Sequence, residues 1–317
     1  MTSPASPNDH FDGRRFFNPG GTRIQPIWKV PRMLMSGRTA WPKHVPVQPQ
    51  RPPPPAGDED IVITFIGHST FLIQTTAGNI ITDPVFVERA SPWQFIGPRR
   101  VREPGARFDD LPPIALVLLS HNHYDHCDLT TLAALDKRFH PRFVTPLNNA
   151  PLLESAGITN VEELDWWQAA STAPLPVWCT PAHHFSARSP FDRNRALWAG
   201  FVVQLGGRRL YFAGDSAYAP LFHDVGRRLG PIDIALMPIG AYEPRWFMKE
   251  VHMMPEESVR AHLDLGARRS IGMHFGTFQL TTEGIDEPTA ALERARTAAG
   301  ISAEEFGTLE FGESVRV

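Results

Sequence analysis

The chain has 317 residues, enough for one large domain or two modest ones, and its 42% hydrophobic and 21% charged residues are ordinary for a globular protein. A formal net charge of −3 argues against a dedicated nucleic-acid-binding protein, because such proteins usually carry a basic surplus. Only two cysteines occur, Cys127 and Cys179, so the sequence contains no disulfide framework and we expect both thiols to be reduced and buried.

The beginning of the chain differs from the rest in charge and proline content. Residues 1–51 hold eight Lys and Arg against two Asp, a charge of +6 that leaves −9 for the remainder. The segment PVQPQRPPPP (46–55) is typical of an extended polyproline spacer. We therefore divide the chain into a basic, proline-rich arm, residues 1–57, and a main domain, residues 58–317. The arm either packs across the main domain or meets an anionic membrane surface or a second subunit.

The sequence also predicts where the protein resides. No apolar run follows the N-terminal charges as in a secretory signal, and no run approaches the roughly 18 apolar residues that a membrane span needs. We expect a cytoplasmic protein, with peripheral membrane contact as an additional interpretation.

Strands dominate the start of the main domain. Three short β-branched runs with Gly and Asn turn signals, between residues 60 and 84, predict an antiparallel meander. The nearly continuous apolar run IALVLLS (114–120) predicts a fully buried strand. Asp128 is then expected to cap a helix that begins with LTTLAAL, because its leucines fall on one helical face.

The same alternation of strands and helices continues downstream. GFVVQL and RRLYFAG (200–214) predict a hairpin around a Gly-Gly turn. A helix is expected to begin at Pro255 and end at Gly266, and a last helix to run from about Pro288 to Ala299. Two series of strands, each followed by helices, predict an α/β sandwich of sheets flanked by helices.

A dense group of metal-ligand residues follows the buried strand. His121, His123, Asp125 and His126 form the pattern H-x-H-x-D-H. Alternation in an extended segment places His121 and His123 on one side, where both can bind one metal, while Asp125 and His126 point to a second centre once the chain turns. Mixed imidazole and carboxylate ligands suit zinc, although iron and manganese also accept them.

Further ligand-type residues also stand just beyond apolar runs, as the first group does. They are His184, Asp215 and His274, with His183 as a competitor for the position of His184. This order of motifs resembles the metallo-β-lactamase superfamily, which implies an αββα sandwich with two mixed β-sheets flanked by helices. The resemblance implies two Zn²⁺ ions per chain. His121, His123 and His184 would bind one, Asp125, His126 and His274 the other, and Asp215 would bridge them.

A closer resemblance rests on segments that are not metal motifs. FFNPG, RASPWQFIGPRR, LSHNHYDHCD, VEELDWW, FAGDSAY, PIGAYEPRWFMK, VHMMPEE and MHFGTF are together similar to the family of N-acyl-phosphatidylethanolamine-hydrolysing phospholipase D and its bacterial relatives. This implies a phosphodiesterase that releases an N-acylethanolamine and phosphatidate through attack of a metal-activated water on phosphorus. It also implies a phospholipid substrate, transient contact with a membrane surface and a homodimer, and no nucleic-acid partner.

Four residues near the motifs are candidates for supporting roles. His252 is the candidate for protonating the leaving alkoxide, and the resemblance implies that it faces the substrate phosphate; otherwise it is a surface histidine at a helix start. Tyr124 either contacts the substrate or packs as an ordinary aromatic. His68 is expected to orient a metal ligand. Arg245 either binds a phosphate or pairs with Glu243 or Glu250.

Two other functions remain open on the sequence alone. The same site could hydrolyse a lactone, a cyclic nucleotide or another small soluble ester, because one fold hosts many chemistries. Alternatively, the metals could only stabilise a non-catalytic scaffold. A hydrophobic channel leading to the metals would favour the lipid, whereas a small polar pocket would favour a soluble ester.

Overall fold

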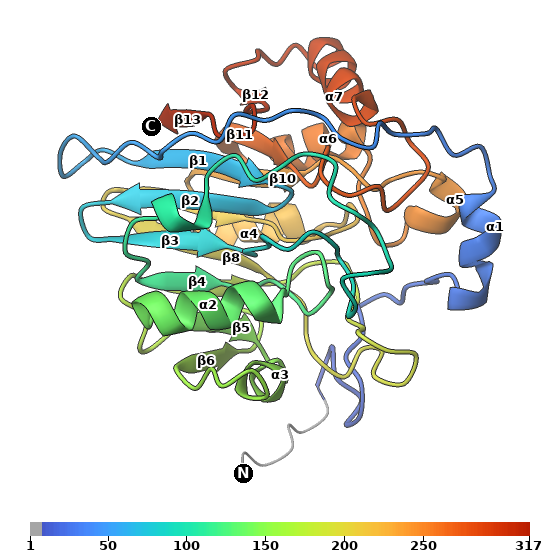
Figure 1. Cartoon of the computed structure of the whole chain (residues 1–317), viewed down its shortest axis with the longest axis horizontal. Coiled ribbons are helices and arrows are strands. Elements are labelled where there is room, and N and C mark those ends of the chain that lie inside the picture. The colour runs from blue at the N-terminus through green and yellow to red at the C-terminus, as the bar shows by residue number, and fades with distance from the viewer. Residues whose placement is uncertain (1–7) are drawn as a thin grey trace.

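Two β-sheets lie face to face with helices on their outer sides, as the computed structural model shows for residues 8–317 (Figure 1). The first sheet has the strand order β13-β1-β2-β3-β4-β5-β6 and the second the order β12-β11-β10-β9-β8-β7. Both sheets mix parallel and antiparallel pairs, so the predicted α/β sandwich of two mixed sheets is confirmed.

The first sheet begins with the predicted meander. Strands β1 (Val62–Gly67), β2 (Thr70–Thr75) and β3 (Gly78–Thr82) pair antiparallel. The strands that follow are parallel to β3 and to one another: β4 (Leu116–Leu118), β5 (Arg142–Pro146) and β6 (Val161–Leu164). The last strand, β13 (Ser314–Arg316), pairs antiparallel with β1 and so joins the end of the chain to the first sheet.

The second sheet repeats this division into an antiparallel and a parallel half. Strands β7 (Val177–Thr180), β8 (Gly200–Leu205) and β9 (Arg208–Phe212) are antiparallel, and β8 and β9 form the predicted hairpin. The parallel strands are β10 (Ile232–Pro238), β11 (Ala267–Met273) and β12 (Phe306–Gly307).

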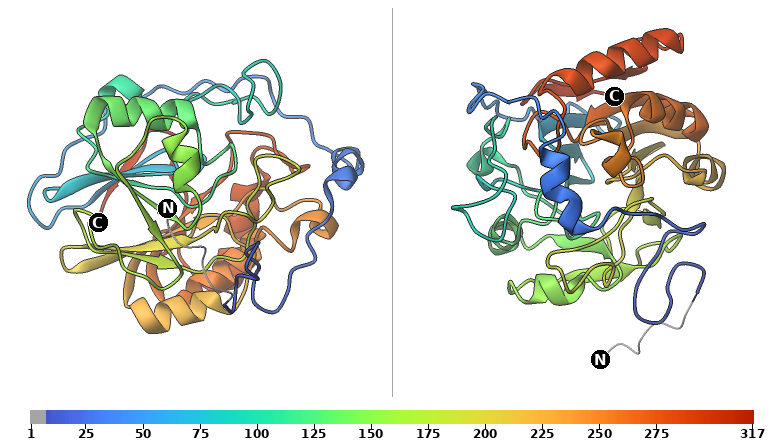
Figure 2. Two further views of the ribbon diagram at one scale, coloured as in Figure 1. Left: turned by 90° about the horizontal axis from the view of Figure 1, so that it is seen from below. Right: turned by 90° about the vertical axis from the view of Figure 1, so that its right-hand side faces the viewer.

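Helices cover the outer faces of the two sheets (Figure 2). The first sheet carries α2 (Leu129–Phe139) and α3 (Ala150–Glu154), and the second carries α4 (Leu221–Leu229), α6 (Pro255–Leu265) and α7 (Glu287–Ala298). Two predicted helix ends are confirmed: the Asp128 side chain accepts a hydrogen bond from the backbone of Thr130, and Gly266 adopts the left-handed conformation that ends α6. Short helical segments lie at Ile27–Lys29, α1 (Val30–Leu34), Phe108–Asp110 and α5 (Arg245–Met248).

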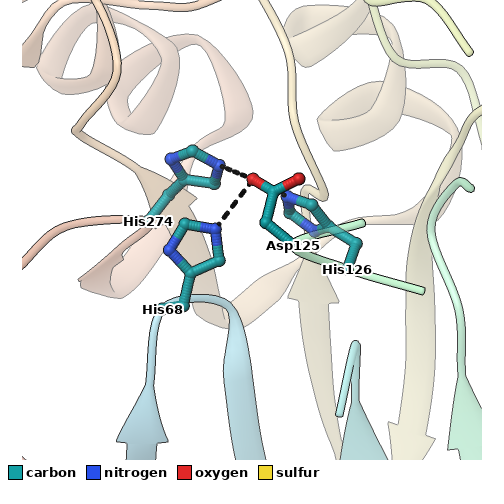
Figure 3. Close-up of side chains that lie close together, drawn as sticks. All are labelled: His68, Asp125, His126 and His274. Atoms are coloured by element: carbon teal, nitrogen blue, oxygen red, sulfur yellow. Dashed lines mark hydrogen bonds and ion pairs between the residues drawn. The ribbon is translucent and has the colours of Figure 1, made fainter. Parts of the chain in front are cut away.

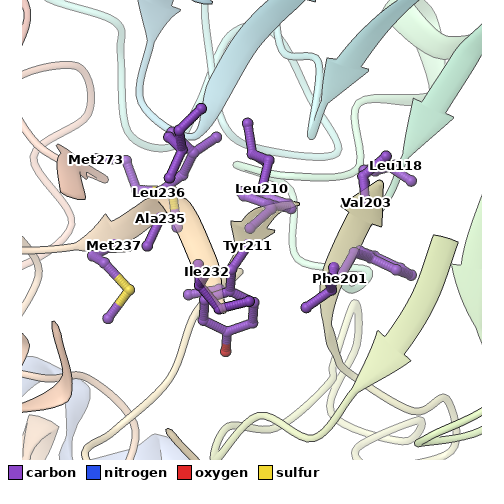
Figure 4. Packing of buried hydrophobic residues seen from close by; sticks show 14 of the residues in the cluster. Leu118, Phe201, Val203, Leu210, Tyr211, Ile232, Ala235, Leu236, Met237 and Met273 are labelled. Carbon is purple, nitrogen blue, oxygen red and sulfur yellow. The ribbon is translucent and has the colours of Figure 1, made fainter. Parts of the chain in front are cut away.

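The main core lies between the two sheets. Leu118 of β4 points toward side chains of the second sheet such as Leu210 and Val203, and the core side chains of β10 and β11 continue the same layer (Figure 4). Trp198 is 1% exposed, and its indole nitrogen donates to the Ala182 carbonyl at 2.9 Å. A densely packed interior of this kind holds the ends of the strands in fixed positions.

The arm lies along the main domain, and its residues 1–7 are outside the described residues. Phe16 is buried in the main core, while the Asn18 amide donates to the His184 carbonyl at 2.8 Å. Further on, the Trp41 indole donates to the Glu283 carbonyl at 2.8 Å. The arm therefore contacts both the core and the segments that carry the predicted site. Within residues 8–317, no helix is both long and apolar enough to cross a membrane.

Candidate metal centre

The predicted ligands meet at one edge of the sandwich because they follow the carboxyl ends of strands from both sheets. His121 follows β4, His184 follows β7, and Asp215 follows β9. His274 directly follows β11. Side chains at the carboxyl ends of parallel strands converge in this way in many α/β proteins.

Three histidines form the first cluster. Ligand atoms of His121, His123 and His184 all lie within 4.8 Å of one another. The distance from His123 Nδ1 is 2.8 Å to His121 Nε2 and 3.3 Å to His184 Nε2. His183 points elsewhere, because its Nε2 lies 3.0 Å from the Thr22 hydroxyl. The geometry therefore favours His184 over His183 as the third member.

A carboxylate and two histidines form the second predicted set, and His68 joins them (Figure 3). Asp125 Oδ2 lies 3.5 Å from His126 Nε2 and 3.4 Å from His274 Nε2. His68 Nε2 lies 3.0 Å from the same oxygen. His68 thus contacts a predicted ligand, in the position that an orienting residue would take.

Asp215 lies between the two clusters and is 3% exposed. Its Oδ2 is 3.1 Å from His126 Nε2 and 3.2 Å from His274 Nε2 in the second cluster. The same oxygen is 3.7 Å from His184 Nε2 and 3.9 Å from His121 Nε2 in the first. Asp215 is therefore placed where it could contribute a ligand atom to either cluster.

The donor set fits metal ions. The Nε2 atoms of His126 and His274 and Oδ1 of Asp215 are buried without a hydrogen-bond partner among the described residues. Buried polar atoms without partners are costly, so such a group at one place indicates a ligand that satisfies them. Imidazole and carboxylate donors are those that zinc accepts, and iron or manganese accept them too.

Burial and charge separate the histidines into two kinds. Burial and neighbouring histidines lower the pKa of His123 to about 3, and burial lowers that of His184 to about 4. Burial also acts to lower the pKa of His126 and His274, but the Asp215 and Asp125 carboxylates outweigh it. They raise the pKa of His126 well above its usual range and that of His274 to about 9. Without metal ions, the first cluster is therefore neutral, and the two carboxylates favour cationic imidazoles in the second.

Asp83 supports both clusters, and the sequence analysis did not identify it. Its Oδ2 accepts from Nδ1 of His126 at 2.6 Å and from the Ser120 hydroxyl at 2.5 Å. The Ser120 oxygen in turn lies 2.9 Å from Nδ1 of His121. One buried carboxylate thus orients a ligand of each cluster. Its position directly after β3 is the same signal that identified the other ligands at strand ends.

The backbone at the site adopts conformations that ordinary residues avoid. His68, Asp83 and His274 have φ values of 57°, 33° and 64°. Such conformations cost on the order of 1–3 kcal/mol each and persist where the surrounding structure enforces them, often at functional sites. Gly240 allows the backbone around His274 to come this close, because a Cβ there would lie 2.0 Å from the His274 carbonyl oxygen. A glycine is therefore required where the end of β10 meets His274.

We expect the Asp83→Asn substitution to lower kcat/KM by about 10- to 100-fold, because an amide cannot hold the His126 proton or the Ser120 hydroxyl as a carboxylate does. Steady-state kinetics and metal content per chain would measure the effect. Asp109→Asn, at a carboxylate that is 99% exposed, is the control. Unchanged activity and metal content in the Asp83 variant would contradict the supporting role.

His252 lies at the edge of the clusters, in the loop between α5 and α6. It is 7% exposed, and its Nε2 is 3.8 Å from Asp215 Oδ2. Burial lowers its pKa well below the usual range. Arg245 holds this loop, since its guanidinium donates to the His252 carbonyl at 2.9 Å and pairs with Glu257 at 2.9 Å. Glu257, and neither Glu243 nor Glu250, is therefore the ion-pair partner of Arg245.

The Tyr124 side chain forms its hydrogen bond and its cation–π contact with Arg188, and neither involves a predicted metal ligand. Its hydroxyl donates to the Arg188 carbonyl at 3.0 Å, and the Arg188 guanidinium lies 3.9 Å from the centre of its ring. It does not line the cavity above the clusters. A substrate contact by Tyr124 stays a prediction.

A cavity of about 350 Å³ opens above the metal ligands. His123, Asp125, Asp215 and His252 form its base. Most of the other lining side chains are apolar, and they come from the arm, the loop after β7, the α5 region and the segment after β11: Ile24, Val30, Phe185, Ala187, Pro190, Phe247, Met248, Val251 and Leu280. This catalytic cavity therefore joins an ionic base to apolar walls.

The fold and the site together define a metal-dependent hydrolase. The family model of the beta-lactamase superfamily domain matches residues 78–275, which include Asp83 and every predicted ligand. The chain belongs to this superfamily, as the sequence motifs predict.

Within this superfamily, the chain is similar to several individual proteins. The chain is 36% identical over 270 residues to N-acyl-phosphatidylethanolamine-hydrolyzing phospholipase D 1 of Caenorhabditis elegans, covering 81% of this chain and 76% of the nematode protein. It is 34% identical to the mitochondrial N-acyl-phosphatidylethanolamine-hydrolyzing phospholipase D of Saccharomyces cerevisiae, covering 73% of this chain and 50% of the yeast protein. Igni18, a metallo hydrolase from the archaeon Ignicoccus hospitalis, has a TM-score of 0.61 over 81% of this chain and 98% of that chain. At 21% identity this last likeness shows the fold alone.

Proposed function

We propose that the protein is a binuclear zinc phosphodiesterase of the phospholipase D type that hydrolyses N-acyl-phosphatidylethanolamine. Water adds to phosphorus, the bond between phosphorus and the head-group oxygen breaks, and the products are phosphatidate and an N-acylethanolamine. The two relatives named for this activity support the proposal.

The observation that carries the proposal is the composition of the catalytic cavity. Its walls are mainly apolar, and Arg193 is the single cationic side chain among them apart from histidines. The Arg193 guanidinium lies 5.0 Å from the centre of the Phe185 ring and forms no ion pair with any residue from 8 to 317. An unpaired guanidinium beside a metal cluster suits a phosphate, and the apolar walls suit the first part of an acyl chain.

Each group of residues at the site has a separate role in this reaction. Metals held by the two clusters would activate water and polarise a phosphoryl oxygen. Asp215, which lies between the two clusters, would supply a carboxylate ligand to the metals of both. His252 lines the cavity, where its imidazole can donate a hydrogen bond to the departing head-group oxygen. The apolar walls restrict the entry of bulk water, which strengthens the electrostatic interactions at the base.

A small soluble ester is the second candidate. The cavity volume of about 350 Å³ supports it, since this is near the lower end of the range of roughly 300–1,000 Å³ for small-molecule sites and would enclose such an ester completely.

A release assay with zinc-loaded protein tests the proposal. It compares N-acyl-phosphatidylethanolamine, phosphatidylcholine, bis(p-nitrophenyl) phosphate and a simple lactone, with Asp215→Asn as the control. We expect N-acylethanolamine release that disappears in the control. Turnover of the small diester without the lipid would overturn the lipid substrate and keep the phosphodiesterase. Turnover of the lactone alone would overturn both the lipid substrate and the phosphodiesterase activity, and would favour the soluble-ester hydrolase.

A further inference from the structure

We propose that the loop 91–98, together with a neighbouring basic groove, is a docking surface for a bilayer that contains anionic phospholipids. The proposal rests on the proposed lipid substrate for its purpose, but its geometry is independent of the metal centre. Three observations carry it: an ordered loop that exposes large apolar side chains, cations without acidic partners beside that loop, and a shared wall with the catalytic cavity.

The loop 91–98 presents apolar side chains to solvent from a fixed backbone. Trp93, Phe95 and Ile96 are 59%, 80% and 56% exposed. The Arg89 guanidinium holds the loop from within, since it donates to the Gln94 carbonyl at 3.1 Å and to the Gly97 carbonyl at 2.7 Å. Adjacent exposed aromatic and aliphatic groups on an ordered loop indicate a surface that another apolar phase covers.

Gly97 shows that the shape of the loop is specific. Its φ is 103°, and a Cβ at this position would lie 2.6 Å from the Ser91 Cβ. The backbone of Ala90 also donates to the Pro98 carbonyl at 3.1 Å, which closes the base of the loop. The sequence therefore fixes a closed loop with its apolar residues at the tip, rather than a flexible segment that could fold them inward.

A basic groove of about 520 Å³ lies between this loop and α1. Its cationic lining side chains are Arg38, Lys43, Arg89 and Arg99. Among the ion pairs of residues 8–317, only Arg99 of these four has an acidic partner, Glu88 at 2.5 Å. An anionic membrane surface has head-group phosphates above an acyl region. Cations without acidic partners can bind the phosphates, and the exposed apolar side chains beside them can enter the acyl region.

Exposed apolar side chains also flank α1, which lines the groove. Trp28 and Met35 precede and follow this helix in the chain and are 75% and 85% exposed. Val30 of α1 and Leu280 line both the basic groove and the catalytic cavity. A bilayer that covers the loop and the groove would therefore lie beside the mouth of the catalytic cavity.

The size of the catalytic cavity explains why such a surface is needed. At about 350 Å³, the cavity can hold the phosphate, its immediate neighbours and the first part of one chain, but not the whole acyl chains of an N-acylated phospholipid. The chains would have to stay in water or in the bilayer, and leaving them in the bilayer avoids the cost of exposing them. Docking beside the mouth lets the phosphate reach the metal centre while the chains remain in lipid.

Charge favours a membrane over a second copy of the chain as the occupant. A two-fold contact centred on the loop would bring the same surface of both copies together. The groove cations that lack acidic partners would then face each other and repel. Anionic phospholipids instead neutralise them.

Vesicle flotation tests the docking surface with lipids that need not be substrates. The zinc-loaded protein is mixed with phosphatidylcholine vesicles with or without phosphatidylglycerol, at low and high salt. We expect binding that requires phosphatidylglycerol, weakens with salt, and becomes at least about 100-fold weaker in the triple variant Trp93→Ser, Phe95→Ser, Ile96→Ser. Leu263→Ser is the matched control, because Leu263 is an exposed apolar side chain, 56% exposed, that lines neither cavity.

Two further measurements distinguish loss of membrane docking from misfolding and from dimerisation. Turnover of bis(p-nitrophenyl) phosphate checks that the variants fold and keep their metal centre, and light scattering gives the mass in solution. No vesicle binding by the unmodified protein, or equal binding by the triple variant, would overturn the docking surface. A dimer that the triple variant dissociates, without vesicle binding, would assign the loop to a second copy instead. Vesicle binding without hydrolysis of N-acyl-phosphatidylethanolamine would support the docking surface and overturn the proposed substrate.

Discussion

Replacing Asp215 with Asn is expected to lower kcat/KM by about 100- to 1,000-fold, since removal of a central electrostatic group typically costs this much. The Oδ2 atom of Asp215 lies within 3.1–3.9 Å of ring nitrogens from both clusters and from His252. Asparagine preserves the volume but removes the negative charge that links the clusters. Its amide group would also direct a donor toward sites that require an acceptor.

The measurement combines kinetics with metal content and a thermal melt. We expect the variant to fold and to bind fewer metal ions per chain, because it lacks the bridging carboxylate. Asp224→Asn, on the surface of α4, is the control for the change of charge. Two metals bound with more than a tenth of the activity would show that Asp215 is not the bridge.

Removing the metals is expected to abolish activity completely and to lower the melting temperature by roughly 5–15 °C, since tightly bound ions stabilise only the folded chain. Without metals, the Nε2 atoms of His126 and His274 and Oδ1 of Asp215 are buried without hydrogen-bond partners among residues 8–317. Dialysis against a chelator, followed by calorimetry and the release assay, would measure both effects. Restoration with Zn²⁺, Fe²⁺ or Mn²⁺ in separate samples would identify the active metal.

Restoration should also depend on pH in a defined direction. The pKa of His274 in the metal-free protein is raised to about 9, because Asp215 and Asp125 outweigh burial. The imidazole is therefore protonated at neutral pH and must lose its proton to bind a metal. Metal affinity should rise as the pH rises toward 9 and fall as the pH decreases.

The chelation experiment also tests the non-catalytic scaffold. Loss of stability after chelation, in a protein that had no measurable hydrolysis before chelation, would favour the scaffold.

The sequence alone determines the fold class and the candidate metal ligands because both depend on local patterns. The spacing of His121, His123, Asp125 and His126 after a buried strand is a property of residue type and order. The two-sheet sandwich follows from alternating strands and helices, and the structure confirms it. The helix signals at Asp128 and Gly266 act within one or two turns, so they too can be read directly from the chain.

The tertiary structure decided what depends on contacts between distant segments. The end of β3 makes Asp83 a candidate in sequence, but its contacts with Ser120 and His126 depend on the pairing of β3 with β4. The pairing of Arg245 with Glu257 likewise depends on how the loop between α5 and α6 folds back.

The placement of the arm could not be predicted from local sequence either. Its charge and aromatic residues allowed either packing or an interaction surface, and nothing local distinguishes the two. In the structure Phe16 enters the main core, Val30 lines the catalytic cavity, and Trp28 remains exposed. Burial of a side chain is set by what other segments place around it, and this information is absent from any single stretch of the sequence.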